Sequence, residues 1–264
     1  MNKIDLKKSF SKINKNQDLI AIKAEFEAEG NSLEELTLLS NHCHFFNLPL
    51  TLKIGGPQAK RDIFEAIQIG ANKILAPMVE SESALEQFIE LFNESFKPFK
   101  DYCDCPFLAI NIETKLSVHN LEEILDFIFY QFGHKISIVI GRSDLSASIY
   151  NNDVNSNLIF NICEKVVKKA RAKDIRVTLG GGLDIYSFKA INELRKIGLD
   201  SFESRKCTLK INENFNKLAF SKSINNCLNF ELDWLLYKKQ HYKNLSDFDE
   251  KRILSIKNRI SKSD

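Results

Sequence analysis

This chain of 264 residues has little proline and glycine, with 5 Pro and 10 Gly, and it contains no low-complexity tract. No segment therefore looks like a flexible linker between domains. An excess of one charge is also missing, because the formal net charge is +2 and the basic residues are spread along the chain. We expect no nucleic-acid partner, and we interpret the basic stretch at residues 165–176 as a solvated helix face.

Long apolar segments are absent too. No run of about 18 apolar residues predicts a membrane span, and the polar amino terminus lacks the apolar core of a signal peptide. The six cysteines are scattered, so we expect a cytoplasmic protein with reduced thiols and no membrane association. The His-Cys-His at 42–44 and the Cys-Asp-Cys at 103–105 have no partner pair at zinc-finger spacing, which favours helix packing and a surface loop.

What the sequence does contain is a regular alternation of short apolar strands and amphipathic helices, which predicts a parallel sheet. Polar residues follow the strands along the whole chain, which favours a (β/α)8 TIM barrel over a doubly wound open sheet with one switch point. An eighth strand is weak, with residues 208–211 or part of residues 1–18 as candidates. The seven clear strands are expected at residues 19–25, 49–54, 73–76, 107–112, 136–140, 175–179 and 200–204.

The pattern changes after the predicted barrel domain of residues 1–211. In residues 212–264 the strand signals vanish, and the leucines at 228, 232 and 235 suggest one helix. A second helix is suggested by the apolar residues at 248, 253, 256 and 260. A helical extension with exposed apolar faces must pack on the barrel or on a neighbouring subunit, so we expect a homo-oligomer.

Two of the predicted strands end in carboxylates, Glu113 and Asp144. Side chains at the carboxyl ends of barrel strands meet at one mouth, and hard oxygen ligands suit Mg²⁺ or Mn²⁺. We therefore predict a divalent-metal site there. The alternatives are a strand-end charge paired with Arg or Lys for Glu113, and a helix cap for Asp144.

Further charges stand at the end of the first strand. Alternation along a strand places Lys23, Glu25 and Glu27 on one side, where a pocket facing the metal would explain so many charges. The alternative is an exposed acidic loop that begins a helix.

Anion-binding groups are expected at other strand ends. Arg142 and Arg205 are candidates for holding a substrate carboxylate or phosphate, although Arg205 could instead pair with Glu203. Gly181 and Gly182 allow close backbone approach to an anion, or they form a tight turn. No dinucleotide fingerprint is present, so no NAD is expected.

Three motifs carry a family resemblance: IGANKILAPMVES at 69–81, NIET at 111–114 and GRSDLSAS at 141–148. From about residue 19 to residue 209 the sequence resembles the HpcH/HpaI aldolase and citrate lyase β-subunit superfamily. The resemblance implies a (β/α)8 barrel and Mg²⁺ or Mn²⁺ held at the positions of Glu113 and Asp144. It also implies reversible carbon–carbon cleavage that yields a pyruvate or acetyl enolate.

The sequence departs from the family pattern at two strand ends. Lys53 stands where the family usually has an Arg that contacts the carbonyl oxygen, and Lys keeps the charge but loses the bidentate fork. The family's Glu-His pair becomes Glu27-Ala28, so the His is missing.

We therefore predict a metal-dependent lyase or aldolase that acts on a small anionic 2-keto acid through a metal-stabilised enolate. Alternatives are an acyl-CoA or phosphoenolpyruvate lyase on the same metal site, or a non-catalytic binding and assembly module. The predicted catalytic residues are Lys53, Glu27, Lys23 and Glu25; the predicted substrate-binding residues are Arg142, Arg205, Gly181 and Gly182.

Overall fold

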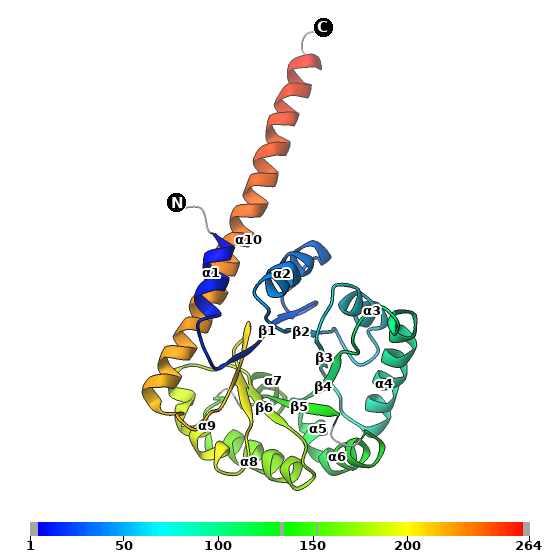
Figure 1. The fold of residues 1–264 in the computed structure, drawn as a ribbon, viewed down its shortest axis with the longest axis vertical. Helices are drawn as coiled ribbons and strands as arrows, with labels where there is room; N and C mark the ends of the chain where they lie inside the picture. The colour runs from blue at the N-terminus through cyan, green and yellow to red at the C-terminus, as the bar shows by residue number, and fades with distance from the viewer. Residues whose placement is uncertain (1–4, 133–134, 152, 261–264) are drawn as a thin grey trace.

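The structure, a computed structural model, describes residues 5–132, 135–151 and 153–260. Eight strands follow one another in chain order around a closed barrel, and helices surround it (Figure 1). The predicted α/β barrel with a helical extension is confirmed. The strands are β1 (Leu19–Glu25), β2 (Leu50–Lys53), β3 (Lys73–Ala76), β4 (Phe107–Ile112), β5 (Ile136–Gly141), β6 (Val177–Gly180), β7 (Ser201–Glu203) and β8 (Cys207–Lys210).

The helices begin where capping residues stand in the sequence. Ser32 and Glu35 form a capping box at the start of the helix after β1. Ser81 caps the helix after β3 through its side chain, which accepts a hydrogen bond from the Ala84 N–H. The α-helices are α1 (Leu6–Ile13), α2 (Leu33–Phe45), α3 (Lys60–Gln68), α4 (Glu82–Phe96), α5 (Lys115–His119), α6 (Leu121–Phe127), α7 (Arg142–Ser148), α8 (Asn157–Ala172), α9 (Phe188–Arg195) and α10 (Lys217–Ile260); short helical turns are η1 (Lys97–Phe99), η2 (Ile128–Phe132) and η3 (Ile185–Ser187).

The barrel departs from the (β/α)8 pattern at its last strand. β1 to β7 pair in parallel, but β8 pairs antiparallel to both β7 and β1. Residues 204–206 join β7 directly to β8, and so short a connection allows only a hairpin. The eighth strand thus lies at the later of the two predicted positions, while the earlier segment contains helix α1.

The interior of the barrel is unusually polar. The main hydrophobic core lies between the strands and the helices, whereas a separate small cluster holds only Leu75, Ala109 and Val139. Thr178 and Ser201 share a hydrogen bond of 2.7 Å on the neighbouring strands β6 and β7. Charged groups from the strand ends occupy much of the remaining interior, which places the chemistry of the molecule at its mouth.

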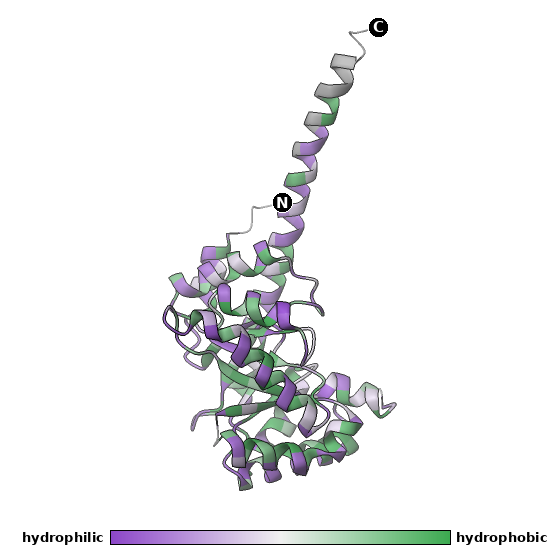
Figure 2. Cartoon of the chain, turned by 90° about the vertical axis from the view of Figure 1, so that its right-hand side faces the viewer, coloured by the Kyte–Doolittle hydropathy of each residue, from purple (hydrophilic) through white to green (hydrophobic). Residues whose placement is uncertain are grey.

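The carboxyl-terminal segment is one helix, not the two that the sequence predicted. α10 runs unbroken from Lys217 to Ile260, and this stretch contains no Gly or Pro to interrupt it. Its first half packs beside α1 and α9, where no helix follows β7 (Figure 1). Its second half projects away from the barrel (Figure 2). No helix in the described part of the chain is long and apolar enough to cross a membrane.

Candidate active site at the mouth of the barrel

A depression of about 440 Å³ lies at the carboxyl ends of the strands. The fold brings together every predicted site residue at its wall except Glu27 and Arg142. Groups from six strand ends therefore converge, as expected for a barrel of this class. The predicted residues that line the depression are Lys23, Glu25, Lys53, Glu113, Asp144, Gly181, Gly182 and Arg205.

Glu113 is fixed at the end of β4 by directed hydrogen bonds. The backbone N–H of Met78 donates to Oε1 over 3.0 Å, and the Asn111 amide donates to Oε2 over 2.6 Å. Gly141 makes room for the side chain, because a Cβ at this position would lie 2.7 Å from Glu113 Oε2. The carboxylate is therefore held in one orientation with its charge at the mouth.

The electrostatic surroundings of Glu113 suit a cation. Burial raises the pKa of Glu113, Lys53 opposes that effect, and the negative charge of Asp144 adds to it; the net pKa is above its ordinary value. Asp144, near the start of α7, is exposed and lines the same depression. A cation between these two carboxylates would offset the repulsion between their negative charges.

The donor set fits a divalent ion that prefers oxygen. Glu113 and Asp144 supply carboxylate oxygens, and the buried Asn111 Oδ1 has no hydrogen-bond partner in the structure. In the described residues, no group of three or more His, Cys, Asp and Glu side chains is arranged as a complete metal site. Two carboxylates leave coordination positions for substrate and solvent.

A row of alternating charges crosses the mouth from β7 to β4. Lys23 Nζ lies 2.6 Å from Glu203 and 3.4 Å from Glu25, while Lys53 Nζ lies 3.8 Å from Glu25 and 3.9 Å from Glu113. Burial lowers the pKa of Lys23, but Glu203 and Glu25 outweigh it and raise this pKa. Burial raises the pKa of Glu25, but Lys23 and Lys53 bring it below its ordinary value. Both groups therefore stay charged.

Sequence reasoning missed the role of Glu203, whose partner is Lys23 and not the adjacent Arg205. Gly180 accommodates it, since a Cβ there would lie 3.1 Å from Glu203 Cγ. The position of Glu203 as the last residue of β7 was the available signal. Its partner on β1 was not predictable, because β1 and β7 come close, with only β8 between them, when the barrel closes.

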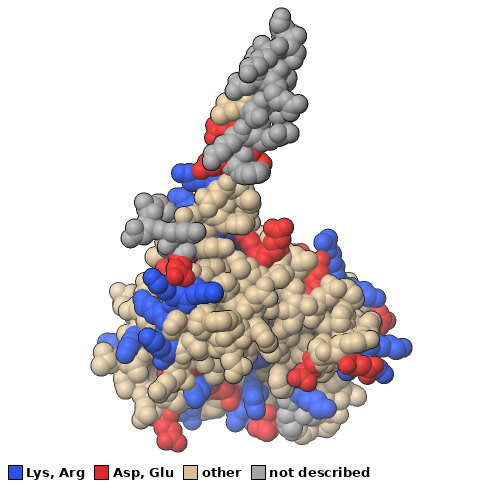
Figure 3. Space-filling model, turned by 45° about the horizontal axis from the view of Figure 1, so that its top comes forward, with Lys and Arg blue, Asp and Glu red and all other residues tan. Residues whose placement is uncertain are grey.

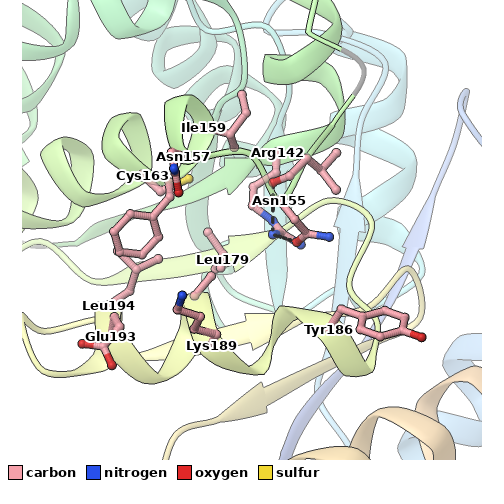
Figure 4. A pocket seen from close by; sticks show the side chains of 13 residues that line it. Arg142, Asn155, Asn157, Ile159, Cys163, Leu179, Tyr186, Lys189, Glu193 and Leu194 are labelled. Atoms are coloured by element: carbon pink, nitrogen blue, oxygen red, sulfur yellow. Dashed lines mark hydrogen bonds between the residues drawn. The ribbon is translucent and has the colours of Figure 1, made fainter.

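Glu27 and Arg142 are not brought to the mouth. Glu27 is exposed in the loop after β1, and its side chain lies over Gly55, where a Cβ would be 2.5 Å from Glu27 Cδ. Arg142 was expected to face the substrate, but its guanidinium donates to the carbonyl oxygens of Gly180 and Gly181 and points into the helix layer (Figure 4). The alternation argument fails for Glu27 because β1 has already ended.

Helix α10 also contributes to the mouth, which the sequence did not indicate. Leu228 and Glu231 line the same depression as Glu113 and Asp144. Burial raises the pKa of Glu231, and the charges of Arg205 and Lys206 oppose this without reversing it. Lys206, which precedes β8, pairs with Glu29, and its Nζ lies 5.5 Å from the centroid of the Trp234 ring on α10. The helix is therefore anchored beside the site.

A closed α/β barrel with charged side chains at the carboxyl ends of its strands belongs to the TIM-barrel class, in which this end of the barrel carries the active site of the enzymes. The family described as HpcH/HpaI aldolase/citrate lyase matches residues 53–181 of this chain, a stretch that holds Lys53, Glu113 and Asp144. The resemblance found in the sequence is confirmed, and it suggests a lyase or aldolase.

Solved structures share the fold. An HpcH/HpaI aldolase/citrate lyase family protein from Burkholderia cenocepacia J2315 is 14% identical, with a TM-score of 0.60 over 74% of this chain and 81% of that one. An HpcH/HpaI aldolase from Desulfitobacterium hafniense DCB-2 is 14% identical, with a TM-score of 0.59 over 73% and 80%. The citrate synthase SbnG is 16% identical, with a TM-score of 0.59 over 76% and 81%. No curated protein sequence matches this chain.

Proposed function

We propose that this protein is a divalent-metal-dependent carbon–carbon lyase or aldolase that acts on a small anionic 2-keto acid. The observation that carries this proposal is the pair Glu113 and Asp144 at one mouth, with Lys53 Nζ 3.9 Å from Glu113 Oε2. These carboxylates would hold Mg²⁺ or Mn²⁺, which would polarise the substrate carbonyl and stabilise the negative charge that develops on its oxygen.

The other residues of the mouth suit an anionic substrate. Lys53 places a second positive charge beside Glu113, where an enolate oxygen needs stabilisation. Arg205 is exposed at the rim and can hold a carboxylate, as can backbone N–H groups near Gly181 and Gly182. Glu25 is ionised and lines the mouth, so it is the candidate to accept a proton. Lys23 stays protonated and acts through its charge.

A small-molecule substrate also agrees with the surface. On the face shown in Figure 3, Lys and Arg side chains are interspersed with Asp and Glu among uncharged residues. An extended polyanion would need a basic stripe or patch. The enclosed depression of about 440 Å³ instead has the size of a site for a small ligand.

Hydrogen exchange on pyruvate tests the proposal without knowledge of the second substrate. Formation of the enolate removes a methyl proton, and D₂O returns a deuteron, so the methyl signal in the proton NMR spectrum decreases. We expect exchange that requires Mg²⁺ or Mn²⁺ and stops with a chelator. A protein that binds Mn²⁺ in calorimetry but exchanges no methyl hydrogen would contradict the proposed chemistry and favour a binding module.

We also infer that the protein self-associates through the projecting half of α10. Residues 243–247, 249 and 250 are all exposed, and a helix without packing is marginal in water. Lys239 and Lys243 precede Asp247 and Glu250 along this helix. Antiparallel pairing with a second copy, centred near Leu245, places the basic block of each helix against the acidic block of the other.

Substitution of Leu245 tests this pairing. Leu245→Asp inserts a charge at the centre of the paired helices, so we expect a dimer to become a monomer in analytical ultracentrifugation. Ser246→Asp is the matched control, because it adds the same charge on an adjacent face of the same helix turn. A wild-type protein that stays monomeric at about 50 µM, or a dimer unaffected by Leu245→Asp, would contradict the inferred contact.

A further inference from the structure

A second cavity lies outside the barrel, in the helix layer between α8 and α9 (Figure 4). Its volume is about 260 Å³, just below the roughly 300–1,000 Å³ of typical small-molecule pockets. It lies on the far side of the 180–182 loop from the mouth, because Arg142 lines it while Gly180 and Gly181 line the mouth. Its apolar lining includes Val154, Ile159, Phe160, Leu179, Ala190 and Leu194.

The guanidinium of Arg142 lies in the wall of this cavity and carries an uncompensated charge. Only 2% of Arg142 is exposed. Its N–H groups donate to carbonyl oxygens, to the Asn155 amide oxygen and to the Ser187 hydroxyl, all of which are neutral. Within the described chain no carboxylate forms an ion pair with it, and a buried charge without a counter-charge is costly.

The acidic side chain whose charge acts on Arg142, Asp184, already has hydrogen-bond partners of its own. Asp184 attracts Arg142 at a distance, but its carboxylate accepts from the Tyr186 N–H at 2.9 Å and from the Ser187 hydroxyl at 3.2 Å. At the rim, Glu193 pairs with Lys196. No acidic side chain therefore neutralises the guanidinium from within the cavity wall.

The geometry around Nη1 leaves room for an anion. Nη1 lies 3.4 Å from the Val154 carbonyl oxygen and 3.2 Å from Asn155 Oδ1, whereas the shortest contact of the guanidinium joins Nη2 to the Gly181 carbonyl oxygen over 2.9 Å. Asn155 is exposed, so its side chain can turn away at little cost. Lys189 adds a second positive charge at the exposed rim.

We propose that this cavity is a second binding site, which takes a small carboxylate with an apolar aromatic or branched body. Arg142 would hold the carboxylate, and the apolar walls from α8, β6 and α9 would enclose the body. Polar side chains such as Asn157, Tyr186 and Glu193 also line the cavity. The buried part of its wall around Ile159, Leu179 and Leu194 is nevertheless apolar, which favours a ligand with an apolar body over a sugar or a free phosphate. The inference does not depend on the reaction proposed for the mouth.

Benzoate and benzamide, which share a shape but differ in charge, are the probes. By calorimetry on the full chain we expect benzoate to bind at least about tenfold more tightly than benzamide, as a charge-assisted contact requires. Ala190→Phe fills the cavity without removing Arg142 and should abolish benzoate binding. Ala172→Phe, at the exposed end of α8, is the matched control and should leave binding unchanged.

Two further variants separate the sites. Arg205→Gln should not alter benzoate binding, because Arg205 belongs to the mouth. Arg142→Lys keeps a charge but loses the fork, so it should weaken binding if it folds, and the Ala190→Phe result decides the question if it does not. Equal binding of the two probes, retention of benzoate by Ala190→Phe, or no binding of benzoate at millimolar concentration would each overturn the proposal.

Discussion

Glu113→Gln should abolish the metal-dependent exchange of pyruvate methyl hydrogens, with a loss of at least about a hundredfold. The substitution removes one of two carboxylate charges and keeps the size of the side chain. Met78 N–H can still donate to the amide oxygen, and Asn111 can present its unpaired Oδ1 to the new amide group. We therefore expect an intact fold with weaker Mn²⁺ binding in calorimetry.

Glu90→Gln is the control for this experiment, since it makes the same chemical change on the exposed surface of α4. It should leave exchange and Mn²⁺ binding at the wild-type level. Full exchange activity in Glu113→Gln would remove the proposed metal chemistry, because the other buried carboxylates at the mouth, Glu25 and Glu203, already pair with lysines.

Lys23→Met should cost about 3–5 kcal/mol of the free energy of unfolding, as expected when one partner of a buried ion pair is removed. Glu203 and Glu25 are 5% and 6% exposed, and both would lose their closest positive charge. The measurement is urea denaturation at pH 7. Because the folded protein raises the pKa of Lys23, this stabilisation is present below the unfolded pKa of about 10.4 and is lost as pH rises through the higher folded pKa.

Two variants check the cause of this loss. Lys23→Met combined with Glu203→Gln removes both charges of the shortest pair, so it should recover part of the stability. Lys168→Met breaks an exposed pair with Glu164 and should cost about 0.5 kcal/mol or less. If Lys23→Met costs no more than Lys168→Met, the charge row does not hold the interior of the barrel together.

Most of the barrel was predictable because two signals mark a strand: an apolar run, and a polar residue where that run ends. β4, for example, combines an apolar run with a polar end at Glu113, and a capping residue, Thr114, follows. The direction of β8 was not predictable from its own four residues, because they can pair in parallel or antiparallel. Only the short connection from β7 decides for antiparallel pairing. The sequence suggested two helices because the apolar residues of this segment fall into two groups, at 228–235 and 248–260, but no Gly or Pro separates them and α10 is unbroken.

The candidate site was predictable only as far as strand ends determine it. Glu113 and Asp144 follow from the rule that the carboxyl ends of the strands meet at the mouth, whereas Lys53 was indicated by the family resemblance. The orientation of Arg142 was not predictable from strand alternation, because Arg142 is the first residue of α7 and not part of β5. Its guanidinium donates to the carbonyl oxygen of Gly181 and does not line the mouth. Leu228 and Glu231 were not predictable because only tertiary packing brings α10 to the mouth.

Closure of the barrel during synthesis depends on β8, the last strand in the chain. β1 finds its second neighbour only in β8, and Ser9 of α1 donates to Asp233 of α10 across 224 positions of the chain. A nascent chain on the ribosome therefore carries an open sheet edge at β1 until β8 has been translated, which exposes that edge to wrong pairing. A ribosome that stalls before β8 has been translated should leave β1 unpaired, and such a chain should bind chaperones that shield unpaired strands.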